Sequence, residues 1–108
     1  MKHRSRTDIV AQVLATVNDH DRYGYGVTQT TIRNEVFLSG AQLKEHLIAL
    51  TIHGLLSYNS TTRTHNATEK GLRFLNIYYK MDDMVNEGEQ QQQQQQPLSS
   101  LVSQQVQM

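Results

Sequence analysis

A capped helix with a leucine stripe is the feature that most limits what this chain can fold into. Ser39-Gly40-Ala41-Gln42 matches a capping box, in which Ser caps the first turn and Gln reaches back to the cap's N–H. Three leucines follow at helical spacing, namely Leu43, Leu47 and Leu50. Gly54 is the residue type that most often ends a helix. The sequence therefore predicts a helix from about Ser39 to His53 with one buried face.

Two further helices are predicted before it. Apolar residues recur at helical spacing between Thr7 and His20, namely Ile9, Val10, Val13, Leu14 and Val17. Ser5 and Asp8 offer N-cap chemistry at the start of that segment. A short second helix begins at Thr28, another good cap, and ends close to Ser39. Two helices separated by such a tight turn are typical of a helix-turn-helix.

The segment after Gly54 predicts a β-hairpin followed by a long helix. Residues 57–67 contain two short runs of strand-forming residues around a polar turn ending at Arg63. Thr68 then caps a helix over residues 68–86, and Gly88 is expected to end it. The predicted fold is mainly α with a small β-hairpin, a winged helix-turn-helix with a long C-terminal helix.

Composition divides the chain into three parts. Residues 1–6 form a basic N-terminal arm, residues 7–86 the folded domain, and residues 87–108 a low-complexity tail with seven consecutive glutamines, expected to be disordered. The chain has no cysteine, no leader-like apolar segment and no run long enough to cross a bilayer. These features indicate a cytoplasmic, nucleoid-associated protein.

Charge is distributed unevenly although the formal net charge is zero. All 10 Lys and Arg lie in residues 1–80, whereas four of the acids lie beyond them, so the first 80 residues carry an excess of four positive charges. A basic domain of this kind suits a polyanionic partner such as DNA. A scatter of surface charge without any ligand is the alternative.

In a winged helix-turn-helix the third helix enters the major groove and the hairpin is the wing. With the leucines buried, the outward residues near the start of the helix at 39–53 are Ser39, Ala41, Gln42, Lys44 and Glu45. Gln42 suits adenine, Lys44 suits guanine or a phosphate, and Glu45 can accept from cytosine. Predicted backbone or minor-groove contacts are Thr61, Thr62 and Arg63 at the wing tip, Arg33, and Arg4 and Arg6 in the arm. Arg33 could instead pair with Glu35 or Asp21.

Several short motifs between Arg6 and Tyr79 resemble the archaeal winged-helix family of small transcription regulators and abundant 10 kDa chromatin-type proteins. They are Thr28-x-x-x-Ile32, Leu38-Ser39-x-x-Gln42-Leu43, Leu47-x-x-Leu50, Gly54-Leu55-Leu56, Thr68-x-Lys70-Gly71 and Phe74-Leu75-x-x-Tyr78. The resemblance implies binding of double-stranded DNA, usually by dimers formed through the last helix, and a similar use of Gln42, Lys44 and Arg63. Asn66 departs from the family, which has an apolar residue there.

The last helix carries a short seam of apolar residues that is expected to form a homodimer. The predicted interface consists of Phe74, Ile77, Tyr78, Met81, Met84 and Val85. The alternative is that Leu72, Leu75 and Tyr79 pack on the first helix and the remaining apolar side chains face solvent.

Other functions are less well supported by the residues. His46 and His53 share a helical face, but they lack the acidic or thiolate partners of a typical metal site. No metal or other cofactor is therefore expected, and the sequence indicates no small-molecule ligand. No catalytic motif is present, and no enzyme activity is expected. The main alternative is a winged helix that binds another protein and no DNA, which the zero net charge and Glu45 favour.

Overall fold

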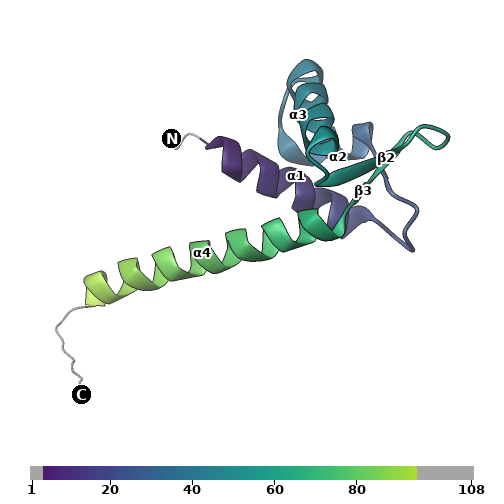
Figure 1. Ribbon diagram of the computed structural model, residues 1–108. Coiled ribbons are helices and arrows are strands. Elements are labelled where there is room, and N and C mark those ends of the chain that lie inside the picture. Colours follow the sequence, from purple (N-terminus) through teal and green to yellow (C-terminus); the bar gives the residue numbers. More distant parts are fainter. Residues whose placement is uncertain (1–3, 95–108) are drawn as a thin grey trace. The chain divides into compact units, whose positions relative to one another are not determined.

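The computed structural model describes the backbone of residues 4–94 and the side chains of residues 4–85. The elements, in chain order, are α1 (Arg6–His20), β1 (Val27–Thr28), α2 (Gln29–Val36), α3 (Gly40–Ile52), β2 (Leu56–Asn59), β3 (Thr64–Ala67) and α4 (Glu69–Gln94) (Figure 1). They divide into two compact units, Met1–Asn76 and Ile77–Met108, and α4 begins in the first and continues into the second. The mainly helical architecture with a small antiparallel sheet agrees with the prediction.

Side-chain caps begin the first three helices where the sequence predicts them. Ser5 Oγ accepts from Asp8 N at 3.0 Å, and Asp8 Oδ2 accepts from Ser5 N at 3.1 Å. Thr28 Oγ1 accepts from Thr31 N at 3.3 Å at the start of α2. The predicted box at α3 is also present, with both Ser39–Gln42 hydrogen bonds at 3.1 Å. Each cap satisfies N–H groups that the first helical turn leaves without a partner.

The sheet has three antiparallel strands in the order β1-β3-β2. The sequence predicts a hairpin and allows a short extended segment from Tyr23 to Val27, but it predicts no pairing between them. Val27 of β1 lies opposite His65 of β3, and Tyr58 of β2 lies opposite His65 on the other side. A strand of two residues carries too little periodicity to be recognised, so the pairing is decided by the neighbouring β3.

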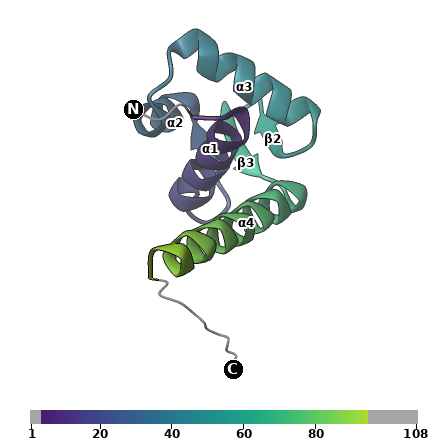
Figure 2. The ribbon, with the colours of Figure 1, turned by 90° about the vertical axis from the view of Figure 1, so that its left-hand side faces the viewer.

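The core of the first unit lies among α1, α2, α3 and the sheet. Its fully buried large side chains are Val13, Leu14, Val17, Ile32, Val36, Leu43 and Leu56. Figure 2 shows α3 passing across α1, with β2 and β3 beside them. The start of α4 approaches the same core, because Gly71 lies against Leu55 O and Leu14. This packing leaves the outer face of α3 uncovered.

Helix α4 is longer than predicted. The sequence places its end at Gly88, but the helix continues through that residue to Gln94. A glycine inside a helix costs about 1 kcal/mol relative to alanine, and the glutamines after it are good helix formers. Of the predicted disordered tail, residues 87–94 are therefore helical, and residues 95–108 lie outside the described part. Within the described residues, no helix is both long and apolar enough to span a bilayer.

Candidate nucleic-acid interface

The exposed face of α3 is the one that the leucine stripe predicts. Leu43, Leu47 and Leu50 are at most 4% exposed. Ala41, Gln42, Lys44, Glu45 and Ile48 face solvent on the opposite side. Phe37 takes the left-handed conformation at the end of α2, with φ of 57°, and turns the chain into the cap of α3. The tight turn thus places a capped helix with a free polar face on the surface.

Gln42 has two predicted roles that compete for one atom. Its Oε1 accepts from the backbone N–H of Ser39 at 3.1 Å in the capping box. Reading adenine needs both ends of the amide, since Oε1 accepts from the base while Nε2 donates to it. While the box is closed, one lone pair of Oε1 is used and the side chain is held at Ser39, so Nε2 is the freer of the two ends. The sequence predicts each role separately, and the structure shows that they share Oε1.

Arg33 lies beside the N-terminus of α3. A Cβ added at Gly40, the first residue of α3, would lie 3.8 Å from Nη1 of Arg33. The alternative pairing with Glu35 or Asp21 is not seen among the described residues. Glu35 instead lies 3.8 Å from His20, and Asp21 accepts from Gly26 and Asn66. Among the described residues, no ion pair engages Arg33. A guanidinium next to a helix N-terminus is a favourable place for a phosphate.

The hairpin turn is ordered by its own side chains. Asn59 Oδ1 accepts from Thr61 N at 2.9 Å and from Thr62 N at 3.3 Å. Arg63 N donates to Asn59 O at 2.7 Å, and Arg63 takes a left-handed φ of 58°. The hydroxyls of Thr62 and Thr64 are 2.7 Å apart. The turn therefore holds the exposed Arg63 at the tip, while Thr61 and Thr62 serve in part to close the loop.

A match to a known protein family identifies this arrangement of helices and hairpin. A family model described as winged helix-turn-helix matches residues 3–86. The chain belongs to the winged helix-turn-helix family. Domains of this family are typical of DNA-binding proteins and are generally not enzymes. No curated protein sequence matches the chain.

In this winged helix-turn-helix domain, a groove of about 290 Å³ separates α3 from the wing. Its lining consists of Gln29, Lys44, Leu47, Ile48, Thr51, Tyr58 and His65. The sequence pattern does not predict that Gln29, Tyr58 or His65 lies on this face. Of these three, Tyr58 could have been inferred from the sequence, since it lies in the predicted first strand of the wing. In the structure it is 49% exposed.

His65 forms the floor of that groove. It is 7% exposed, and its ring centroid lies 4.8 Å from that of Tyr58. Nδ1 of His65 is buried without a hydrogen-bond partner among the described residues. Desolvation by burial lowers the pKa of this imidazole below its ordinary value, so the neutral form is favoured.

The basic N-terminal arm is not free at the residues that the structure describes. Nη1 of Arg4 donates to Gln12 Oε1 and, at 2.8 Å, to the backbone oxygen of Val36 at the end of α2. The carbonyls at a helix C-terminus carry partial negative charge, which attracts the guanidinium. Arg6 is the first residue of α1 and not part of an extended arm. Lys2 lies outside the described residues.

The predicted dimer residues fall in both units. Phe74, in the first unit, is half-buried. In the second unit, Ile77 is 58%, Met81 61%, Met84 70% and Val85 60% exposed, and Tyr78 is half-buried. Leu75 is buried, as the alternative to the dimer expects, whereas Leu72 and Tyr79 are exposed. The second unit thus carries an apolar surface along α4.

In the described part of the chain, no three His, Cys, Asp or Glu residues are close enough together to hold a metal ion. His46 and the C-cap residue His53 do lie on one side of α3, as the sequence predicts, but that side borders a separate cavity away from Lys44.

Proposed function

We propose that this protein binds double-stranded DNA and regulates transcription. Helix α3 lies in the major groove, and the wing lies on the backbone or in the minor groove. The observation that carries this proposal is the placement of Arg33, without an ion pair in the described structure, at the capped N-terminus of a helix whose outer face is free. The family, whose members typically bind DNA, supports it.

The residues have separate roles in this proposal. Arg33 and the first turn of α3, including Ser39 and Ala41, hold a phosphate, which sets the register of the helix. Lys44 and Glu45 face base edges, and Gln42 contributes its Nε2. Arg63 reaches the backbone or minor groove from the wing tip. Arg4 and Arg6 contribute long-range charge only, because Arg4 is bound to the end of α2 and Arg6 belongs to α1 and not to an extended arm.

We further propose that the protein acts as a homodimer through the apolar surface of α4, because one copy offers few cations to DNA. The relation to archaeal regulators is part of the same proposal and is supported by the motif spacing alone.

A gel-shift titration of a duplex at several salt concentrations tests DNA binding. Affinity should fall linearly with salt on a double-logarithmic plot. Arg33→Gln and Arg63→Gln should each reduce the slope by about one unit. Arg73→Gln, which removes a cation 3.7 Å from Glu69 on α4, is the matched control and should leave the slope unchanged. No shift at about 50 mM salt would exclude the proposal.

A protein-binding module is the second candidate. Three large apolar side chains on or beside the helix-turn-helix are well exposed, with Phe37 at 82%, Ile48 at 51% and Ile52 at 75%. Glu45 lies on the same helix and would repel phosphates. This function predicts that the protein fails to shift DNA at any salt concentration.

A further inference from the structure

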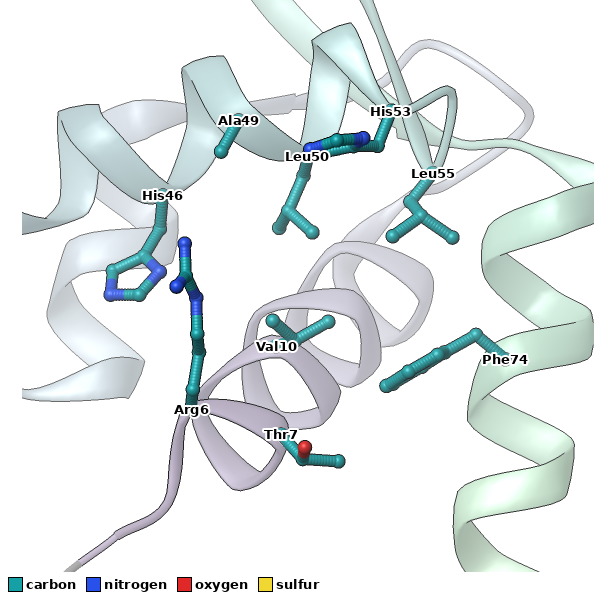
Figure 3. Close-up of a pocket in the computed structure, with 9 residues that line it drawn as sticks. All are labelled: Arg6, Thr7, Val10, His46, Ala49, Leu50, His53, Leu55 and Phe74. Atoms are coloured by element: carbon teal, nitrogen blue, oxygen red, sulfur yellow. The ribbon is translucent and has the colours of Figure 1, made fainter.

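A second cavity borders α3 on the side away from Lys44. It has a volume of about 390 Å³ and lies between α1, α3 and the first turns of α4, all within the first unit. Its lining consists of Arg6, Thr7, Val10, His46, Ala49, Leu50, His53, Leu55 and Phe74 (Figure 3). Pockets for small ligands have volumes of about 300–1,000 Å³. The cavity is therefore large enough for a small organic molecule.

The chemistry of the lining is divided between an apolar part and a cationic edge. Val10, Leu50, Leu55 and the ring of Phe74 supply the apolar part. Arg6 extends from the start of α1 toward His46 on α3 in Figure 3. His53 adds a second imidazole, and Thr7 adds a hydroxyl. No acid lines the cavity. This lining complements a molecule with an apolar body and one negative charge.

Arg6 is available for such a molecule. Within the described residues, no hydrogen bond or ion pair engages its side chain, whereas Arg4, two residues earlier, is bound to the end of α2. The nearest acid in sequence, Asp8, accepts the backbone N–H of Ser5 in the capping box. A guanidinium at the mouth of an apolar cavity binds a carboxylate through two parallel hydrogen bonds.

We propose that this cavity binds a small aromatic carboxylate. The carboxylate lies on Arg6, with an N–H of His46 and an N–H of His53 as further hydrogen-bond donors, and the aromatic ring lies against Phe74 and the aliphatic side chains. This class of ligand follows from the single guanidinium, the apolar lining and the volume of the cavity.

The site shares α3 with the proposed DNA interface. His46, Ala49, Leu50 and His53 line this cavity from one flank of the helix, while Lys44 and Ile48 line the groove on the opposite flank. An occupant that favours one position of α3 therefore changes DNA affinity. This consequence rests on the proposed function, whereas binding of the carboxylate does not.

An NMR titration of the ¹⁵N-labelled full chain with sodium 2-naphthoate at constant ionic strength tests the site, with neutral 2-naphthamide as the comparator. The expected result is saturable shifts of the amides of Thr7, Ala49 and His53, and an affinity for the amide at least tenfold lower. Absence of saturation up to about 10 mM, shifts centred elsewhere, or equal affinity for the two probes would overturn the proposal.

Variants test the charge of Arg6 and the space inside the cavity separately. Arg6→Gln should weaken naphthoate binding at least tenfold. Arg22→Gln, the same change about 20 Å away beyond the other end of α1, should leave it within twofold. Ala49→Leu fills the cavity and should abolish binding of both probes, with the far-ultraviolet circular dichroism spectrum unchanged. Equal naphthoate affinity of wild type and Arg6→Gln would contradict the assignment. Since these measurements contain no DNA, failure of the proposed function would leave their outcome intact.

Discussion

Nδ2 of Asn66 donates to Oδ2 of Asp21 across 2.8 Å, and this hydrogen bond ties β3 to the loop after α1. The other oxygen of the same carboxylate accepts from Gly26 N at 2.8 Å, immediately before β1. Asn66 also donates to Gly24 O at 3.3 Å. Asn66, the residue that departs from the archaeal family pattern, therefore anchors the loop that leads from α1 to β1.

Replacing either partner should destabilise the domain. Asn66→Ala and Asp21→Ala should each lower the free energy of unfolding by about 1.5–3 kcal/mol, because a hydrogen bond to a charged group is lost. Urea denaturation measures both, and Asn34→Ala on the exposed side of α2 should change stability by less than about 0.5 kcal/mol. In the double variant the two losses should be less than additive. Strict additivity would show that the residues act independently.

His65 should make stability depend on pH. Burial lowers its pKa below the ordinary 6.5, so the unfolded chain binds a proton at a pH where the folded chain does not. The free energy of unfolding should therefore be level above pH 6.5 and fall as the pH drops below it, by no more than about 1.4 kcal/mol per pH unit for one proton. The difference between the profiles of wild type and His65→Leu isolates this slope. Parallel profiles would contradict the assignment.

Gly71 should not tolerate a side chain. A Cβ there would lie 2.2 Å from Leu55 O and 3.1 Å from Leu14, so the backbone would have to move. Gly71→Ala should cost about 2–3 kcal/mol, although alanine favours a helix by about 1 kcal/mol. Gly40→Ala is the matched control, because its Cβ would meet only Arg33 at 3.8 Å. Thermal unfolding should show a clear decrease for the first variant alone, and equal melting temperatures would refute the close approach.

Gln42 can be tested for its two roles separately. Gln42→Glu preserves the capping box and adds a negative charge at the N-terminus of α3, so stability should be equal or higher by about 0.5 kcal/mol. DNA affinity should nevertheless fall at least tenfold, because the charge faces phosphates. Gln42→Ala should lower stability by about 0.5–1 kcal/mol with a smaller effect on DNA affinity. Unchanged DNA affinity of the Glu variant would place Gln42 outside the interface.

The apolar surface of the second unit predicts self-association. Met81 and Met84 are 61% and 70% exposed and lie three residues apart on α4. Sedimentation equilibrium should give a dimer for the wild type and a monomer for Met81→Glu, Met84→Glu. The control Lys80→Glu, Asn76→Glu adds the same number of acids to α4 at polar positions and should remain dimeric. An unchanged mass of the methionine variant would exclude this interface.

The local chemistry of the chain determined much of the fold. The caps at Ser5, Thr28 and Ser39 join residues three apart, so they are predictable from the sequence alone, as is the buried leucine face of α3. The predicted end of α4 at Gly88 was wrong because glycine weakens a helix without terminating it.

Tertiary structure decided the contacts between residues far apart in the chain. Pairing of β1 with β3, the anchoring of Asp21 by Asn66 and the capture of Arg4 by the end of α2 all join such segments. Sequence periodicity does not predict these contacts, because it reflects only the local conformation of each segment. The partner residues come together when the core packs. The sequence alone therefore determined where α3 begins and which of its faces is free. The tertiary structure determined that Arg33 lies beside the N-terminus of α3 and that a cavity lies on each flank of this helix.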